Sequence, residues 1–282
     1  MKFGINTWVW VSPLTTARLA ELAPHIAALG FDWIELPLEV IEDIDYDRAA
    51  AIIRDSGLEV SCCVAMGPDR DLIHPDKQIR DNGMAYVRQC IDAVHTVGGT
   101  NLVGPLYATV GRTWQQTAAE RAHDLDILVD NLSDLAKYAG DRGVVMGVEP
   151  LNRFETSFIN LAGQVIEVVD RVDHPACRIM LDTFHMNIEE KSLGDAIRAA
   201  GPRLVHLHSC ENDRGAPGSG NVDWPGVAQA LKDINYEGPI VIESFTPDVK
   251  SIARAAAIWR PLAPSSDGLA TEGLAFLQEL LS

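Results

Sequence analysis

The chain has 282 residues, 47% of them hydrophobic and 22% charged, which is enough to bury a sizeable globular core. A formal net charge of −17 argues against a nucleic-acid partner, because binding to phosphates needs a basic face. No apolar run approaches the length of a membrane span and the first residues lack the features of a secretory signal, so we expect no membrane association.

Short β-branched runs alternate with longer amphipathic stretches along the whole chain, which is typical of parallel βαβ units. In chain order, the pattern predicts strands at residues 2–9, 33–37, 59–65, 101–106, 144–150, 178–183, 204–209 and 239–244. Helices are expected at about 15–30, 46–56, 76–97, 114–142, 161–172, 192–200, 224–234 and 250–260, with a last one near 268–281.

Eight strands followed by helices favour a closed barrel over an open sheet. Gly30, Gly57 and Gly143 each follow an expected helix and precede a strand, as C-terminal helix caps do. No GxGxxG motif follows the first strand, so a dinucleotide-binding fold lacks its main support. Because no linker or composition shift divides the chain, we predict an α/β protein, a single (β/α)8 TIM barrel covering residues 1–282.

Potential metal ligands recur where the last four expected strands end. Glu149 ends VVMGVE, Asp182 ends RIMLD, Glu243 ends PIVIE, and His206 and His208 alternate in LVHLHS. Each alone would be read as a solvated residue or a hydrogen-bonded core histidine. Their recurrence on four consecutive strands carries the signal, because the carboxyl ends of barrel strands converge on one axis and hold the chemistry of such enzymes.

We therefore predict a metal site at the carboxyl ends of strands five to eight, made by Glu149, Asp182, His208 and Glu243. Three carboxylates crowded together would repel one another unless a cation lay between them. Carboxylates with one imidazole suit a hard or borderline divalent ion, with Mn²⁺ first and Mg²⁺ or Co²⁺ as alternatives. His206 faces the same interior one layer deeper, and we interpret it as a core residue or a support for the ligands.

Further polar residues lie just beyond these strand ends, where a substrate would bind. Glu155 lies in NRFET, His185 in DTFHMN, and Arg214 in the glycine-rich loop SCENDRGAPGSG. Loops of this kind often close over a ligand. We interpret Glu189, Glu190 and Lys191, in the next loop, as solvated residues.

These motifs make the chain resemble a known family. VEPLNRFET, IMLDTFHMNIEE, HLHS followed by ENDRGAPGSGNVDW, and VIESF occur in the order and with the separations of the D-tagatose 3-epimerase / D-psicose (D-allulose) 3-epimerase family. That family lies within the xylose-isomerase-like barrel superfamily. The long motif LDTFHMNIEE is specific, and the similarity extends from the first strand to the final helix.

The resemblance implies an activity and roles for the residues that match the motifs. It implies that the four predicted ligands hold the metal and that Glu149 and Glu243 are also the acid/base pair on opposite faces of a ketose. It places Glu155, His185 and Arg214 on the hydroxyl and carbonyl groups near C1 and C2 of the sugar. The expected reaction is interconversion of C3 epimers of free ketoses such as D-tagatose, D-psicose, D-fructose or L-ribulose.

The chain departs from the family pattern at three places. Val110 lies near the place of a tryptophan that follows the fourth strand in the family, with Trp114 a few residues later. Ser244 follows Glu243 where a proline is common, and Asn6 occupies an aromatic position at the end of the first strand. These departures concern the far end of the sugar rather than the metal.

Other functions on the same barrel compete with this one. A ketose–aldose isomerase of the hydroxypyruvate- or rhamnose-isomerase type, or another keto-sugar or inosose isomerase or lyase, would use the same ligands. A phosphodiesterase like endonuclease IV would need a zinc cluster supplied by more histidines than the 8 present, and a basic face. A non-catalytic sugar-binding barrel would have no use for two acidic residues on the metal.

The setting of the protein is expected to be simple. The five cysteines show no CxxC spacing and most lie in apolar runs, which fits free thiols in a cytoplasmic protein. The expected partner is a small sugar, and the resemblance implies a homodimer or a homotetramer, for which the apolar segment 258–262 is a candidate contact surface.

Overall fold

Eight parallel strands close into a barrel in the computed structural model, which describes residues 1–282. Each strand pairs with the next along the chain, and the last pairs with the first through Ile5 and Ile242. The predicted fold class, a (β/α)8 barrel, is confirmed. The strands are β1 (Lys2–Asn6), β2 (Trp33–Pro37), β3 (Glu59–Cys63), β4 (Asn101–Gly104), β5 (Val145–Val148), β6 (Cys177–Asp182), β7 (Leu204–Ser209) and β8 (Pro239–Ile242).

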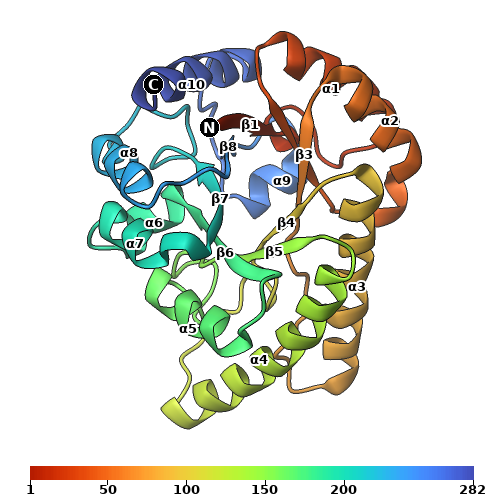
Figure 1. Cartoon of the computed structure of the whole chain (residues 1–282), viewed down its shortest axis with the longest axis vertical. Coiled ribbons are helices and arrows are strands. Elements are labelled where there is room, and N and C mark those ends of the chain that lie inside the picture. Colours follow the sequence, from red (N-terminus) through yellow and green to blue (C-terminus); the bar gives the residue numbers. More distant parts are fainter.

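Helices form a ring around these strands, and Figure 1 shows one exception, α9, which lies across the middle of the barrel in that view. The helices are α1 (Thr16–Ala28), α2 (Tyr46–Ser56), α3 (Lys77–Val97), α4 (Ala118–Gly140), α5 (Ala162–Val172), α6 (Thr183–Glu189), α7 (Leu193–Ala200), α8 (Trp224–Asp233), α9 (Lys250–Ala255) and α10 (Ser266–Leu280). Short 3-10 turns are η1 (Thr7–Val9), η2 (Ile41–Asp43) and η3 (Gly201–Arg203). None of the helices is both long and apolar enough to cross a membrane.

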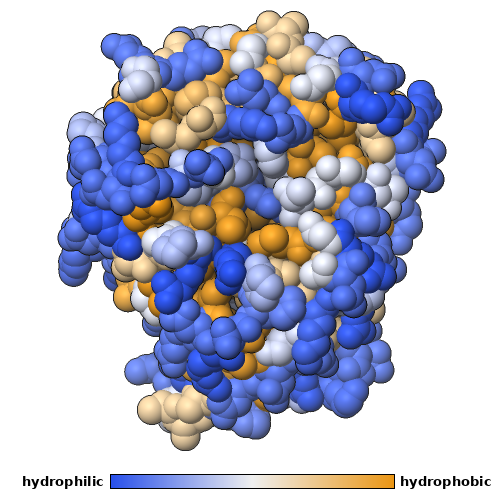
Figure 2. All heavy atoms as spheres, viewed as in Figure 1, coloured by the Kyte–Doolittle hydropathy of each residue, from blue (hydrophilic) through white to orange (hydrophobic).

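The strands are covered on both faces. Every residue of β2, β4 and β8 is buried, because helices pack on the outside of the barrel and side chains fill its interior. Figure 2 shows a largely hydrophilic rim on the displayed face, with several clusters of hydrophobic residues toward its middle.

Local signals fix where several helices begin and end. Asp45, Asp76 and Thr117 each accept a hydrogen bond from a backbone N–H in the first turn of α2, α3 and α4, as N-terminal caps do. Gly57 ends α2 in the left-handed conformation, with φ of 71°. The predicted bounds of α2 are therefore reproduced to the residue.

Several strands and helices are shorter than predicted, and two of the differences have a clear local cause. The first strand ends at Asn6 rather than at residue 9, because the Asn6 side chain accepts the N–H of Trp8 and turns the chain into η1. Helix α6 was not predicted at all. Asp182 caps it through the N–H of Phe184, so the ending of β6 and the start of α6 coincide at one residue.

Candidate active site

The four predicted ligand residues converge at the carboxyl ends of the last four strands. Glu149 directly follows β5, Asp182 ends β6, His208 lies in β7 and Glu243 directly follows β8. Their exposed fractions are 6% or less. Three of them, together with the predicted substrate residues, line a cavity of about 270 Å³. Its lining residues include Glu149, Glu155, His185, His208, Arg214 and Glu243.

The Arg214 guanidinium lies between two of the carboxylates. Its Nη1 donates to Asp182 Oδ2 at 2.5 Å and to Glu243 Oε2 at 2.6 Å, and the group stacks 4.0 Å from the ring of Phe184. The backbone of Arg214 has φ of 69°, a left-handed conformation that is held by hydrogen bonds to Glu211 and Ser244. The loop thus directs the positively charged Arg214 side chain toward Asp182 and Glu243.

His208 is oriented by a residue that the sequence analysis did not single out. Glu35, in β2, is completely buried and its Oε1 lies 2.6 Å from His208 Nε2. Burial by itself would raise the pKa of Glu35, but His208 and His206 lower it well below the ordinary range, so Glu35 is ionised. Nε2 therefore donates to Glu35, and Nδ1 faces Glu243 Oε1 at 3.4 Å without a hydrogen-bond partner.

Glu35 has three more partners inside the barrel. His206 Nε2 lies 2.9 Å from Glu35 Oε2, and Ser61 donates to the same oxygen at 2.9 Å. Asn6 donates to Glu35 Oε1 at 2.9 Å and also contacts the Cys63 thiol. His206 and Asn6 therefore belong to the layer of side chains that holds Glu35 behind His208.

His185 is neutral and lies between Arg214 and the carboxylates. Burial lowers the pKa of His185 to about 3, despite the opposing effect of Asp182. The backbone N–H of Asn152 donates to Nδ1 at 3.1 Å, and Nε2 lies 3.1 Å from Nη2 of Arg214, a group that can only donate. Nε2 lies 3.7 Å from Glu149 Oε1 and 3.8 Å from Asp182 Oδ2. Nε2 of His185 therefore faces one donor, Arg214, and two carboxyl groups at the cavity.

The two glutamates that flank the cavity differ in protonation. Burial and the nearby Asp182 carboxylate raise the pKa of Glu149 well above its ordinary value. Burial alone would also raise the pKa of Glu243, but His208 and Arg214 outweigh it and lower the pKa. The protein without a metal thus holds one protonated and one ionised carboxyl group in the same site, the arrangement of an acid and a base.

The donor set fits a divalent cation. Candidate ligand atoms of Asp182, His208 and Glu243 all lie within 4.8 Å of one another, and Glu149 groups in the same way with Asp182 and His185. Burial would lower the pKa of His208, but Glu35 and Glu243 raise it, so its unpartnered Nδ1 carries a proton. Loss of that proton gives the lone pair that an imidazole ligand needs. Carboxylate oxygens with one imidazole are the ligands of hard or borderline ions rather than of thiolate-preferring ones.

Glu155 lines the cavity, and its side chain accepts a hydrogen bond from Asn152. Its Oε1 accepts from Asn152 Nδ2 at 2.8 Å, and burial raises its pKa. The same asparagine also contacts His185, so Asn152 links two of the predicted substrate residues. All three of these predicted residues, Glu155, His185 and Arg214, line the same cavity as Glu149 and Glu243.

The prediction that residues 189 to 191 are solvated was wrong for the two glutamates. The Glu189 side chain is only 7% exposed and accepts from the backbone N–H, Nε and Nη2 of Arg153. Glu190 accepts the N–H of Ala162 at 2.7 Å at the start of α5. Because α6 was not predicted, its last residues were assigned to an open loop.

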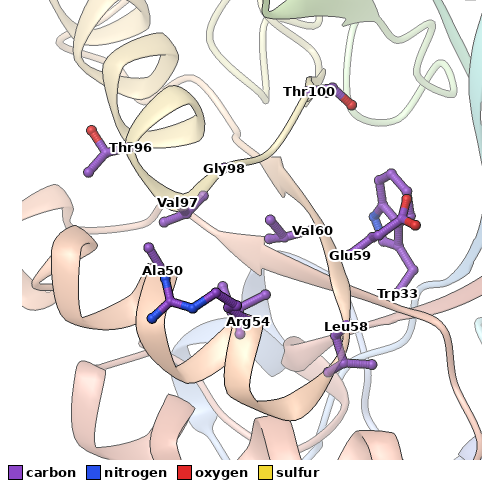
Figure 3. A pocket seen from close by; sticks show the side chains of 11 residues that line it. Trp33, Ala50, Arg54, Leu58, Glu59, Val60, Thr96, Val97, Gly98 and Thr100 are labelled. Atoms are coloured by element: carbon purple, nitrogen blue, oxygen red, sulfur yellow. The ribbon is translucent and has the colours of Figure 1, made fainter.

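A second cavity, of about 490 Å³, lies at the other end of the barrel (Figure 3). It is bordered by Trp33 and Glu59, the first residues of β2 and β3, by Arg54 of α2, and by the end of α3 around Thr96. Barrel enzymes carry their chemistry at the opposite end. Its only charged lining residues, Arg54 and Glu59, are largely exposed to solvent, so this cavity has no arrangement suited to catalysis.

Comparisons with known proteins agree with this site. A family described as xylose isomerase-like TIM barrel matches residues 24–280. The L-ribulose 3-epimerase of Methylomonas sp. (strain DH-1) is 31% identical over 282 residues, which cover 99% of this chain and 97% of that protein. The D-psicose 3-epimerase of Ruminiclostridium cellulolyticum is 34% identical over 270 residues, which cover 95% of this chain and 92% of that protein.

Solved structures give the same picture. A structure of an L-ribulose 3-epimerase superposes with a TM-score of 0.94 at 30% identity, covering 99% of this chain and 94% of that one. Sequence and structure thus match over nearly the full length of both chains. The resemblance inferred from the four motifs is confirmed and extends over the whole barrel.

Proposed function

This chain belongs to the xylose isomerase-like TIM barrel family, and we propose that it is a carbohydrate isomerase, a metal-dependent ketose 3-epimerase. It would interconvert C3 epimers of free ketoses of the D-tagatose, D-psicose/D-fructose and L-ribulose type. Relatives named L-ribulose 3-epimerase and D-psicose 3-epimerase align with nearly the whole chain. The observation that carries the proposal is the pair Glu149 and Glu243, two buried carboxyl groups with opposite pKa shifts on one cavity.

We assign the cation to Glu149, Asp182, His208 and Glu243. Support comes from the proximity of Asp182, His208 and Glu243 to one another, from that of Glu149 to Asp182, and from the unpartnered Nδ1 of His208. When bound, a divalent cation supplies Lewis-acid stabilisation of the negative charge that develops on the sugar oxygens, which is worth several kcal/mol. His208 must lose its Nδ1 proton to become a ligand, so binding of the metal releases a proton.

Glu243 and Glu149 move the protons. Glu243, ionised, removes the proton from C3, and the C–H electron pair moves toward the C2 carbonyl to give an enediolate. Glu149, protonated, donates its proton to the opposite face of C3 while the electron pair returns to carbon. The product is the C3 epimer, and the two carboxyl groups have exchanged protonation states. The reverse reaction uses the same groups in the opposite order, so the reaction is reversible.

The remaining predicted residues orient the sugar. His185 lies against the C2 oxygen, where charge develops, and remains neutral because its pKa is about 3. Arg214 supplies a fixed positive charge beside the same oxygen and beside O1. Glu155, held by Asn152, accepts from a hydroxyl near C1 or C2. Support for these roles comes from the cavity that all three residues line.

The decisive experiment is proton exchange in D₂O. The metal-loaded protein is incubated with D-fructose, D-tagatose and L-ribulose, and the products are followed by NMR. We expect deuterium at C3 together with the C3 epimer. Deuterium at C1 with an aldose product would instead establish a ketose–aldose isomerase. No exchange with any ketose would reject the proposal.

Substitution at the base gives an independent control. Glu243→Gln removes the group that takes the proton, and we expect exchange at C3 to fall by about 10²- to 10⁴-fold. Glu237→Gln, on the exposed segment before β8, is the matched control and keeps wild-type exchange. Equal exchange in both variants would mean that Glu243 is not the base.

We propose Mn²⁺ as the preferred ion, with Mg²⁺ or Co²⁺ as alternatives. One imidazole among carboxylates favours a borderline ion over Mg²⁺, which prefers oxygen ligands and water. Removing the metal with a chelator and restoring activity with each ion in turn ranks them. The highest kcat/KM with Mg²⁺ would contradict the assignment.

Two further parts of the proposal concern assembly and location. We propose a homodimer or homotetramer, supported by Phe154 and Trp259, whose large apolar side chains are 74% and 76% exposed. Light scattering at several concentrations tests it, and a monomer at all of them would exclude it. We also propose a cytoplasmic location, because all five cysteines are free and buried. Fractionation of the producing cells tests that location.

A further inference from the structure

The half of the active-site cavity away from the metal ligands is formed by the first four strands and their loops. The predicted ligands come from strands β5 to β8, so the carbons of a ketose beyond C3 must extend toward the opposite half. That half is mostly apolar. Its lining residues are Trp8, Glu39, Cys63, Val64, Ala65, Gly104, Pro105 and Val110.

Trp8 carries an unused hydrogen-bond donor on this half. Its side chain is 8% exposed, its ring packs 5.3 Å from that of Phe245, and its Nε1 has no hydrogen-bond partner. A buried N–H without a partner is rare in folded proteins, and because Trp8 lines the cavity, a ligand or water there is the available partner. The packing against Phe245 fixes the ring, so the N–H is preorganised.

Glu39 carries an unused acceptor on the same half. Its Oε1 accepts from Ser12 Oγ at 2.6 Å, while its Oε2 is buried without any partner. Ser12 is itself only 8% exposed, so this hydrogen bond fixes the carboxylate. One side of the cavity therefore offers a free donor and a free acceptor. A hydroxyl group, which both accepts and donates, satisfies both.

We propose that Trp8 and Glu39 form a subsite for the terminal hydroxyl of an unphosphorylated ketohexose, in which Trp8 donates to the C6 oxygen and Glu39 accepts its proton. This inference rests on the proposed epimerase function and names the substrates that it selects. No covalent step is involved. The subsite acts on binding and orientation of the sugar, while the reacting carbons remain at the metal ligands.

The same subsite excludes sugar phosphates. The arginine and histidine side chains on the cavity, Arg214, His185 and His208, all lie at the reacting end, so the far half presents no positive charge. A phosphate on C6 would meet the Glu39 carboxylate. Like charges placed together in a partly buried site repel strongly.

The test compares kcat/KM for D-fructose and 6-deoxy-D-fructose in the metal-loaded wild type and in Trp8→Phe. The substitution removes the N–H and keeps an aromatic ring against Phe245. We expect kcat/KM for D-fructose to fall about 10-fold, mainly through KM, and the value for the 6-deoxy sugar to change by less than about twofold. Trp10→Phe is the matched control, because the Trp10 N–H already donates to Asp267 at 2.8 Å.

Glu39→Gln tests the acceptor and the exclusion of phosphate. Wild-type turnover of D-fructose 6-phosphate should lie at least about 100-fold below that of D-fructose, and Glu39→Gln should narrow this gap. Glu42→Gln, at an exposed position in η2, is the control and keeps the wild-type ratio. Metal content and circular dichroism of each variant establish that the site and fold are retained.

The outcomes separate the two claims. Suppose that the wild type epimerises D-fructose, but Trp8→Phe lowers kcat/KM equally for D-fructose and the 6-deoxy sugar, or lowers it for neither sugar. The subsite is then wrong, and the epimerase assignment stands. Efficient turnover of the 6-phosphate by the wild type also rejects the subsite. If the wild type epimerises no ketose, the proposed function fails and the subsite fails with it.

Discussion

Glu35 in β2 and His208 in β7 meet across the interior of the barrel, with Glu35 Oε1 2.6 Å from His208 Nε2. Their strands are not neighbours in the sheet, so this contact is made inside the barrel and not along a strand pair. Because Nε2 is taken by Glu35, Nδ1 is the nitrogen of His208 that faces Glu243 at the predicted metal site. A carboxylate on the far side of a ligand histidine fixes its ring and raises its basicity.

Glu35→Gln should therefore weaken metal binding by about 10- to 100-fold, because the amide no longer fixes the ring of His208 or increases its basicity. The measurement is a titration with Mn²⁺ in which free ion is followed by electron paramagnetic resonance. Glu21→Gln, at an exposed position of α1, serves as the control. Wild-type affinity in Glu35→Gln, with the fold retained, would show that the contact only fills the barrel interior.

Arg214→Met separates metal binding from sugar binding. The guanidinium bonds to Asp182 and Glu243, two proposed ligands, so its removal should leave Mn²⁺ affinity unchanged or higher. The same change should lower kcat/KM by about 10²-fold or more, since a fixed charge beside the developing oxyanion is lost. Arg260→Met, which pairs with Asp213 on the surface, is the matched control. A loss of metal affinity in Arg214→Met would contradict this division.

Gly104→Ala should destabilise the protein more than the left-handed conformation alone explains. Gly104 ends β4 with φ of 125°, and an added Cβ would lie 2.2 Å from the carbonyl oxygen of Val64. Gly57 has φ of 71° and open space around the same position. We expect Gly57→Ala to lower the free energy of unfolding by about 1 kcal/mol and Gly104→Ala by at least about 3 kcal/mol. Urea denaturation of both variants provides the comparison, and equal losses would exclude a clash at Gly104.

The Arg153–Glu189 ion pair makes the stability of the folded protein depend on pH, and the lowered pKa of Glu189 fixes the direction of this dependence. Burial opposes ionisation of Glu189, but the hydrogen bonds and charge of Arg153, with a smaller effect of His185, lower its pKa below the ordinary value near 4.5. A lowered pKa means that the pair contributes stability above the pKa of the unfolded chain. That contribution is lost as the pH falls through the lower pKa of the folded state.

Glu189→Gln should accordingly lower the free energy of unfolding by about 1 kcal/mol at pH 7. The difference in unfolding free energy between the variant and the wild type should shrink as the pH falls below about 4. Glu189 then becomes protonated, and it is neutral like the glutamine that replaces it. Denaturation with urea at pH 7 and pH 3.5 measures it. Glu272→Gln, at an exposed position of α10, is the control. A difference that stays constant with pH would show that the effect is not due to ionisation.

The sequence was sufficient to predict the barrel and to place the candidate site. Strands and helices follow from the spacing of apolar residues, and β2, β7 and α2 have the predicted bounds. Glu149 and Glu243 could be found because strand ends of a closed barrel converge, so position along the chain alone predicts proximity. Their different protonation could not be predicted, since it depends on which charged neighbours surround each group.

Other features depend on information that periodicity does not carry. Glu35 lies in the short run WIELP, and only the register of a fully buried strand decides that its side chain turns inward to the histidines. Helix α6 has 7 residues and starts at Asp182, so the end of a strand hid its beginning. The roles of Trp8 and Glu39 depend on atoms that lack partners, which a sequence does not show.

The division of the cavity between the two halves of the chain has a consequence for engineering. The groups that would hold the ion and move protons all follow β5 to β8, whereas Trp8 and Glu39 follow β1 and β2. Libraries in the first 110 residues that keep Glu35, Asn6 and Ser61, the residues behind His208, can therefore alter which sugars are accepted while the chemistry at C3 is left untouched. A chimera that joins the first half of a relative to residues 111–282 of this chain would inherit its sugar preference from one parent and its reaction from the other.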